Sequence, residues 1–201
     1  MKSILIIFVM SLLLTQACST APSKASRHGL FESDSGRKLA GDLYAPKPGG
    51  DVSLKGDWQW PLSNIEISSP YGERGGKFHQ GVDLRAPMKT PVMAASAGVV
   101  VYVGTKIRGY GRMIVLKHPG NFYTVYAHHS KNCVKMGTSV KMGQVIAYSG
   151  RSGHSSGPHL HFELRRGTQS FDPEYALNGY LKSSVSRKIA SHSRLNHDFE
   201  E

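Results

Sequence analysis

Cysteine is scarce in this chain: only Cys18 and Cys133 occur among its 201 residues. So few cysteines exclude a fold held together by several disulfides and a zinc site made of four thiolates. We expect Cys133 to be a small core or loop residue and not a catalytic thiol.

Acidic residues are also few, since 14 Asp and Glu stand against 25 Lys and Arg and give a formal net charge of +11. This balance favours anionic partners such as a cell-wall polymer, membrane head groups or nucleic acid. The N-terminal sequence, described next, predicts an exported protein, which seldom meets nucleic acid. We therefore expect a wall or membrane partner and no nucleic acid.

A long hydrophobic run occurs only at the N-terminus, where Ile4–Leu14 is almost entirely apolar. The run is shorter than the ~20 residues that span a bilayer, and the positively charged Lys2 precedes it. We interpret residues 1–17 as a signal peptide.

Ala17-Cys18 resembles a lipoprotein processing site, at which the cysteine is lipidated and becomes the new N-terminus. The resemblance is imperfect, because Thr15 and Gln16 stand where a leucine and a small residue are usual. It predicts a protein anchored by a lipid on Cys18 to a bacterial envelope membrane, facing the periplasm and cell wall. Ordinary secretion, with cleavage near Ala17 or Ala21, is the alternative.

The apolar period of an amphipathic helix is missing from residue 65 onward, where short runs bounded by Gly, Pro or Asn follow one another. Strands at this spacing, without helices between them, predict a compact antiparallel all-β domain with long loops. Residues 112–118 alternate like a strand covered on one face, whereas residues 99–103 resemble a central strand. The expected strands are Ile65–Ser69, Gly98–Gly104, Arg112–His118, Asn121–His128, Gln144–Ser149 and His159–Arg165.

The domain boundaries follow from composition. Residues 18–56 are polar and rich in Pro, Gly and Ser, which predicts a linker with one short strand around Lys38–Tyr44. The domain is expected at residues 57–178. Residues 179–201 are basic and polar with few apolar anchors, which predicts a mobile tail.

His159 and His161 are separated by one leucine in a strand-like run. Side chains alternate along a strand, so both histidines and Glu163 share one face while leucine and phenylalanine occupy the other. Two such histidines lie about 7 Å apart, too far for both to bind one zinc ion at about 2.0 Å. Either one binds metal while the other works beside it, or the pair has no chemical role.

His79 and Asp83 lie in a Gly-rich stretch and share a face if that stretch is extended. With one histidine of the pair, they make a three-ligand set that leaves a fourth zinc position for water, as in catalytic sites. His128 ends another strand-like run. The sequence lacks a His-Glu-x-x-His motif, so histidines near the metal would have to handle the proton of the water.

These segments resemble the lysostaphin-type, or LytM-like, zinc metallopeptidases, which cut peptide cross-bridges of bacterial peptidoglycan. The resemblance covers roughly residues 60–173. The sequence departs from the family at His129, where a leucine is usual. The resemblance implies a LytM-like β domain with long loops around a zinc cleft, one zinc ion per chain, metal ligands His79, Asp83 and His161, and catalytic histidines His128 and His159. The matching segments are Ser69–Arg74, His79–Asp83, Val125–His128 and Gly157–Glu163.

Other polar residues near these motifs are assigned less specific roles. His118 is expected to be structural, and His154 to line the rim of the cleft. Glu163 is expected either to orient an imidazole or to be solvated or ion-paired. Arg74 and Tyr71 are more often packing and hydrogen-bonding residues in such turns than substrate contacts.

The sequence therefore predicts a zinc endopeptidase that hydrolyses peptide cross-links of peptidoglycan, with a possible protein regulator. The alternative is a catalytically silent relative that activates a cell-wall amidase; such relatives lose ligands or catalytic histidines, and here all five positions are filled. A basic wall-binding module and a metallopeptidase that acts on proteins are further alternatives.

Overall fold

The computed structural model describes residues 47–48 and 52–197. The predicted signal peptide, Cys18 and the strand expected around Lys38–Tyr44 lie outside these residues. No helix in the described part of the chain is both long and apolar enough to cross a membrane.

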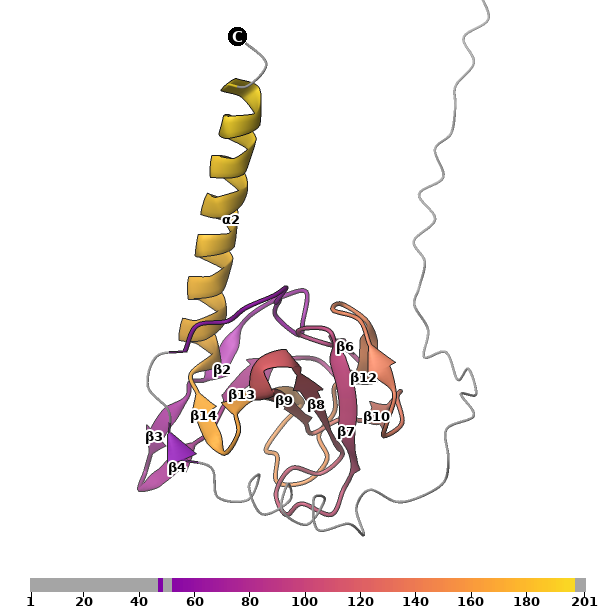
Figure 1. Cartoon of the computed structure of the whole chain (residues 1–201). Coiled ribbons are helices and arrows are strands. Elements are labelled where there is room, and N and C mark those ends of the chain that lie inside the picture. The colour runs from indigo at the N-terminus through magenta and orange to yellow at the C-terminus, as the bar shows by residue number, and fades with distance from the viewer. Residues whose placement is uncertain (1–46, 49–51, 198–201) are drawn as a thin grey trace, which may run out of the picture.

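A nine-stranded sheet forms the body of the domain (Figure 1). Its main path runs β1-β14-β13-β9-β8-β7-β11, and β5 joins the free part of β13 and also pairs with β2. All of these pairs are antiparallel except β1 with β14. The strands are β1 (Lys47–Pro48), β2 (Ile67–Ser69), β5 (Val82–Arg85), β7 (Gly98–Gly104), β8 (Met113–His118), β9 (Phe122–Ala127), β11 (Ser139–Val140), β13 (His159–Arg166) and β14 (Gln169–Phe171).

Two smaller sheets complete the β structure, and the predicted all-β antiparallel class is confirmed. One consists of β6 (Pro91–Met93), β12 (Val145–Tyr148) and β10 (Lys131–Asn132), and the other is a hairpin of β3 (Gly72–Arg74) and β4 (Lys77–His79). A 3-10 turn, η1 (Pro119–Asn121), joins β8 to β9.

The expected strands all occur, but two differ in their burial. Five of the six residues of β8 are buried, so the prediction of a half-covered strand is wrong. Ile114 and Leu116 face the main core, while Met113 and Val115 face a second cluster with Tyr102. Conversely, β7 lies between β8 and the two-residue β11 near the end of the sheet, and it is more exposed than a central strand.

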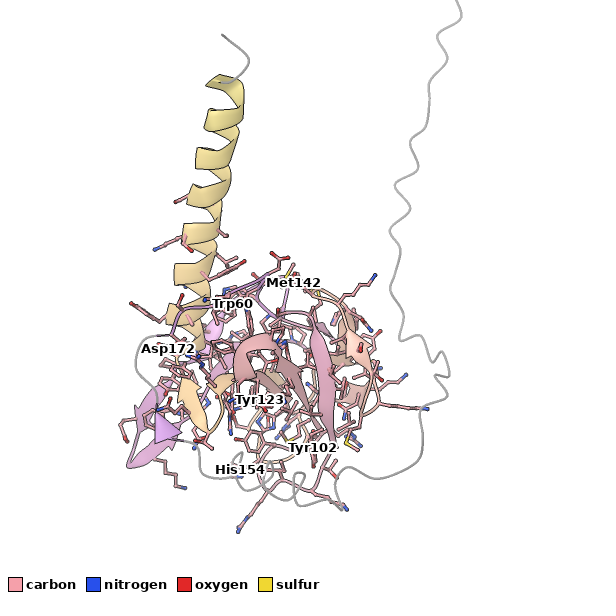
Figure 2. The ribbon with its side chains drawn as sticks, in the orientation of Figure 1. Trp60, Tyr102, Tyr123, Met142, His154 and Asp172 are labelled. Atoms are coloured by element: carbon pink, nitrogen blue, oxygen red, sulfur yellow. The ribbon has the colours of Figure 1, made fainter. Side chains whose placement is uncertain are left out.

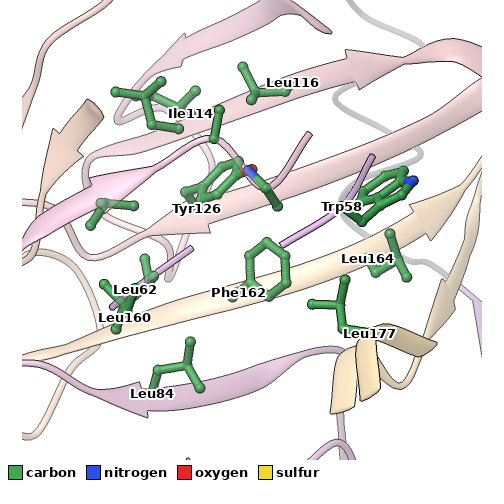
Figure 3. Packing of buried hydrophobic residues seen from close by; sticks show 14 of the residues in the cluster. Trp58, Leu62, Leu84, Ile114, Leu116, Tyr126, Leu160, Phe162, Leu164 and Leu177 are labelled. Atoms are coloured by element: carbon green, nitrogen blue, oxygen red, sulfur yellow. The ribbon is translucent and has the colours of Figure 1, made fainter. Parts of the chain in front are cut away.

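The main core lies against the apolar face of β13 (Figure 3). Leu160, Phe162 and Leu164 are completely buried there, and the Tyr126 ring packs 5.4 Å from the Phe162 ring. Burying side chains of this size stabilises a domain by about 1.5–3 kcal/mol each. The predicted alternation of β13 is confirmed, so its other face is available for polar groups.

The C-terminal region corrects the predicted mobile tail. Residues 173–197 form one helix, α2 (Pro173–His197), which rises from the domain in Figure 1. Leu177 at its base is fully buried in the main core and anchors the helix. The apolar period along the helix is weak, because serine and basic residues are spread around it, and the sequence prediction missed it for that reason.

The predicted linker also packs partly on the domain. β1 pairs with β14, and Leu54 is buried in the core. Trp58, at the start of the predicted domain, is 4% exposed and packs against His118 and Phe122. Cys133 is disulfide-bonded, which the prediction of a simple core or loop residue did not include.

Candidate functional site

The register of three strands brings the predicted residues together. On β13, His161 lies opposite Asp83 of β5 on one side and opposite Ala127 of β9 on the other. His128 follows Ala127 directly. Gly81 permits this arrangement, because a Cβ atom there would lie 2.2 Å from the carbonyl oxygen of Phe162 on β13.

Three of the predicted residues point their ligand atoms at one place. His79 Nε2 lies 3.2 Å from Asp83 Oδ1 and 3.1 Å from His161 Nδ1, and the latter two atoms are 2.9 Å apart. Tetrahedral zinc with bonds of about 2.0 Å needs donor atoms about 3.3 Å apart. The triangle of two imidazole nitrogens and one carboxylate oxygen therefore fits one face of a zinc site.

In each of these histidines, the ring nitrogen that points away from the triangle makes a hydrogen bond, and this bond fixes which nitrogen faces the site. His79 donates from Nδ1 to the carbonyl oxygen of Pro70 at 2.7 Å, so Nε2 carries the lone pair toward the triangle. His161 has the opposite arrangement, because its Nε2 donates to Glu163 Oε1 at 2.8 Å and its Nδ1 faces Asp83. Hydrogen bonds of this kind orient metal-binding histidines in proteins.

Glu163 belongs to a buried polar network that the sequence analysis only partly predicted. It accepts hydrogen bonds from His161, from the Tyr110 hydroxyl at 2.7 Å and from Arg165 Nε at 2.5 Å. Glu163 thus both orients an imidazole and forms an ion pair. Arg165 was missed, although its place two residues after Glu163 puts both side chains on one face of β13.

The charges of this network shift two pKa values. Burial would raise the pKa of Glu163, but the positive charge of Arg165 and the hydrogen bond from His161 lower it to about 2. Burial would lower the pKa of His161, but Asp83 and Glu163 on either side of the ring raise it to about 9. The two carboxylates therefore create a strong preference for positive charge at this position, which a bound cation also satisfies.

His128 and His159 lie beside the triangle. Their ring centroids are 4.6 Å apart, and His159 Nε2 lies 3.7 Å from Asp83 Oδ1. His128 donates from Nδ1 to the carbonyl oxygen of Ser152 at 2.7 Å, and His159 donates from Nδ1 to that of Gly157 at 2.9 Å. These bonds leave Nε2 of each ring as the atom that can accept a proton.

The backbone of His128 is in the left-handed region, with φ of 65°. This conformation is uncommon for a residue with a side chain, and local strain of this kind concentrates at functional sites. Hydrogen bonds from His128 N to Tyr110 O and from His129 N to Arg112 O hold it. Burial lowers the pKa of His128 to about 4, and the nearby rings of His161 and His159 contribute, so its imidazole is neutral.

A cleft surrounds these side chains and has two halves. One hollow, of about 230 Å³, is lined by Phe78, Gln80 and Tyr110 together with histidines of the site. The other, of about 360 Å³, is lined by Arg74, Ser155, Ser156 and His159, again with histidines of the site. His154 borders both halves, as predicted, and lies at the end of the domain away from α2 (Figure 2).

Three residues near the motifs are placed outside the cleft. His129 is fully buried and donates from Nδ1 to Asn132 Oδ1 at 2.7 Å, so it does not replace His128. His118 is buried and contacts the Ala97 carbonyl and the Thr124 hydroxyl, as a structural residue does. The Tyr71 hydroxyl donates to the Ser170 carbonyl, which confirms its expected hydrogen-bonding role.

Comparison with known proteins agrees with this geometry. Residues 77–173, which include all five predicted site residues, match Peptidase family M23. The catalytic domain of lysostaphin from Staphylococcus simulans superimposes with a TM-score of 0.55 at 37% identity, over 58% of this chain and 95% of that domain. This chain belongs to peptidase family M23.

Two curated M23 relatives share the matched region. The uncharacterized lipoprotein YgeR of Escherichia coli K12 is 42% identical over 116 residues, which is 58% of this chain and 45% of YgeR. The DD-carboxypeptidase/endopeptidase Mpg of Neisseria meningitidis serogroup B is 40% identical over 119 residues, which is 56% of this chain and 27% of Mpg. The match thus spans less than half the length of each of these M23 relatives.

Proposed function

We propose that this M23 protein is a zinc endopeptidase that hydrolyses peptide cross-links of bacterial peptidoglycan. The observation that carries the proposal is the arrangement of five side chains in one cleft. His79, Asp83 and His161 turn three donor atoms to one point, and His128 and His159 present Nε2 atoms beside it. A set of three ligands with neighbouring proton acceptors is typical of hydrolytic zinc sites.

His79 Nε2, Asp83 Oδ1 and His161 Nδ1 would hold one zinc ion per chain. When bound, zinc would lower the pKa of a water molecule toward about 7 and withdraw electron density from the scissile carbonyl. Glu163 supports this role, because it keeps the proton of His161 on Nε2 and leaves Nδ1 as a ligand.

His128 and His159 would move the proton during hydrolysis. The neutral imidazole of His128 accepts a proton from the attacking water at Nε2, and the water oxygen bonds to the carbonyl carbon. When the C–N bond breaks, a protonated Nε2 in this pair supplies the proton to the leaving amine. Before that, the single Nε2–H formed by this proton transfer donates to the carbonyl oxygen as its negative charge develops.

We also propose that the chain is exported and carries a lipid on Cys18, which would hold it on an envelope membrane. The lipoprotein name of the YgeR relative and the N-terminal sequence support this location. Cys18 is the only other cysteine of the chain, so a lipid thioether on its sulfur and the disulfide of Cys133 are mutually exclusive. The intact mass of the membrane-extracted protein, with and without reductant, distinguishes the two states.

The direct test is hydrolysis of purified, cross-linked peptidoglycan by the full-length protein in detergent, with zinc measured on the same sample. We expect one zinc per chain, new amino groups and smaller muropeptides. His161→Ala should lose both zinc and activity, whereas the control His129→Leu, outside the cleft, should keep both. Bound zinc with an intact wall would count against peptidoglycan as the substrate, and absence of zinc would favour the amidase-activator or wall-binding alternative.

A further inference from the structure

The two halves of the cleft differ in charge. In the half with Phe78 and Tyr110, the lining residues other than the histidines and Glu163 carry no charge. In the other half, Arg74 is the one lining residue with a permanent positive charge among those described for this hollow. The cleft is therefore polarised across the triangle of His79, Asp83 and His161.

The contacts of Arg74 hold its guanidinium in place but involve only one of its three nitrogen atoms. It lies at the end of β3 in the β3–β4 hairpin, where Nη1 donates to the Ser69 hydroxyl at 2.5 Å and lies 3.5 Å from Asp83 Oδ2. Both contacts involve one nitrogen, while a guanidinium has five N–H donors in a planar fork. The Arg74 side chain is 44% exposed and lines the hollow beside His159.

Asp83 does not neutralise Arg74 fully. The Oδ1 atom of Asp83 faces His79 Nε2 at 3.2 Å and His161 Nδ1 at 2.9 Å, so this oxygen is turned away from Arg74. The remaining oxygen meets Arg74 only at 3.5 Å, longer than the 2.7–2.9 Å of a close charge-assisted hydrogen bond. A second carboxylate, supplied from outside, can therefore bind the free edge of Arg74.

His159 indicates which part of a substrate lies in this half. His159 lines the hollow of Arg74 and not the aromatic hollow. If its Nε2 delivers the proton to the leaving amine, the carbon bonded to that nitrogen lies on the Arg74 side. A carboxylate on that carbon then comes within reach of the guanidinium, while a chain that continues through an uncharged amide does not offer one.

We propose that Arg74 binds a free carboxylate on the carbon next to the leaving nitrogen and so selects the bond that is cut. This inference rests on the proposed peptidase function and specifies its substrate class. Suitable bonds are D-alanyl–diaminopimelate cross-links, whose amine-side carbon carries a carboxylate, and terminal peptide bonds. Glycine–glycine bonds inside a bridge lack this group and are poor substrates.

The test compares two purified muropeptide dimers joined by D-alanyl–diaminopimelate bonds, one with the carboxylate next to the leaving nitrogen free and one with it amidated. We expect the wild-type full-length protein to cleave the free form with a kcat/KM at least about tenfold higher, as one charge-assisted pair provides. Arg74→Gln should lose this ratio, mainly through activity on the free form, and Arg74→Lys should restore part of it. Lys77→Gln, which removes a cation from the same hairpin outside the hollow, should keep the ratio.

Each other result counts against the inference in a distinct way. Equal loss on both dimers in Arg74→Gln, together with a lower zinc content, would mean that Arg74 only positions Asp83. Equal cleavage of both dimers by the wild type would overturn carboxylate selection and leave the peptidase proposal standing. A zinc-loaded wild type that cleaves neither dimer would overturn both proposals.

Discussion

Arg165 donates from Nε to Glu163 Oε2 at 2.5 Å, and the two side chains are 1% and 0% exposed. The other oxygen of Glu163 accepts from Nε2 of His161. One buried carboxylate therefore connects an interior cation to the ring that turns Nδ1 toward the proposed zinc position.

Replacing Arg165 tests this connection. Arg165→Met leaves the Glu163 carboxylate buried without its cation, so we expect the free energy of unfolding to fall by about 3–5 kcal/mol. Zinc affinity should fall about tenfold to hundredfold, because Glu163 then orients His161 less firmly. Urea unfolding and competition with a chromophoric chelator measure the two effects. The exposed neighbour Arg166 is the control: Arg166→Met should change neither much, and unchanged zinc affinity in Arg165→Met would contradict the connection.

The proposed division between ligands and proton carriers gives a second prediction. His128→Ala and His159→Ala should keep zinc but lower kcat by about 10²–10⁴-fold, because each removes a proton-transfer group and not a ligand. His161→Ala should lose the metal itself. Zinc content and peptidoglycan hydrolysis, measured on the same samples, separate the classes. Loss of zinc in His128→Ala would place that residue among the ligands instead.

Gly81 provides a test of the strand packing beneath the site. A methyl group there would collide with backbone atoms of Phe162, which cannot move as a flexible side chain can. We expect Gly81→Ala to cost about 1–3 kcal/mol in unfolding free energy and to weaken zinc binding by shifting β5 against β13. Gly179→Ala, in open space on α2, should be neutral or slightly stabilising. Wild-type zinc affinity in Gly81→Ala would show that the strands adjust freely.

The lowered pKa of the buried His129 side chain leads to a prediction of how the free energy of unfolding changes with pH. Burial lowers its pKa in the folded protein to about 4, whereas the unfolded chain has the usual value of 6.5. Below pH 6.5 the unfolded state therefore binds a proton that the folded state does not, and stability falls as the pH drops from 6.5 toward 4, by up to about 3 kcal/mol. His129→Leu removes this term, although His118, whose pKa burial also lowers, still contributes.

Urea unfolding of wild type and His129→Leu at pH 7.5 and pH 5 measures the difference. The free energy of unfolding should fall less between these pH values in the variant. An equal fall in both proteins would mean that His129 takes up its proton in the folded state, through movement of the buried ring.

Most of the strands, and the alternation of side chains along them, could be predicted from the sequence, because both depend on local patterns. The Gly, Pro and Asn residues that bound each run place the strands, and the alternation of β13 separates His159 and His161 from Leu160 and Phe162. The roles proposed for the five cleft residues came from the family resemblance and stay predictions. Their convergence depends on which strands pair, and no local pattern determines that β5 and β9 both flank β13.

The features that sequence analysis missed depend on tertiary packing. Arg165 looks like a solvated surface residue in sequence, but it is buried in a network with Glu163, and Tyr110 and Gln80 from distant segments contact it there. The β8 strand alternates, yet a second apolar cluster covers its other face. Helix α2 was missed because a few core residues at its base, chiefly Ala176 and Leu177, attach it instead of an apolar stripe along its length.

The two faces of β13 also bear on how such a protein can change during evolution. Leu160, Phe162 and Leu164 hold the strand in the core, while His159 and His161 on the opposite face serve the cleft. A substitution of either histidine leaves the apolar face untouched. A relative can thus lose the proposed zinc chemistry and still keep the folded, basic scaffold, so one or two substitutions are enough to turn this architecture into a binding protein.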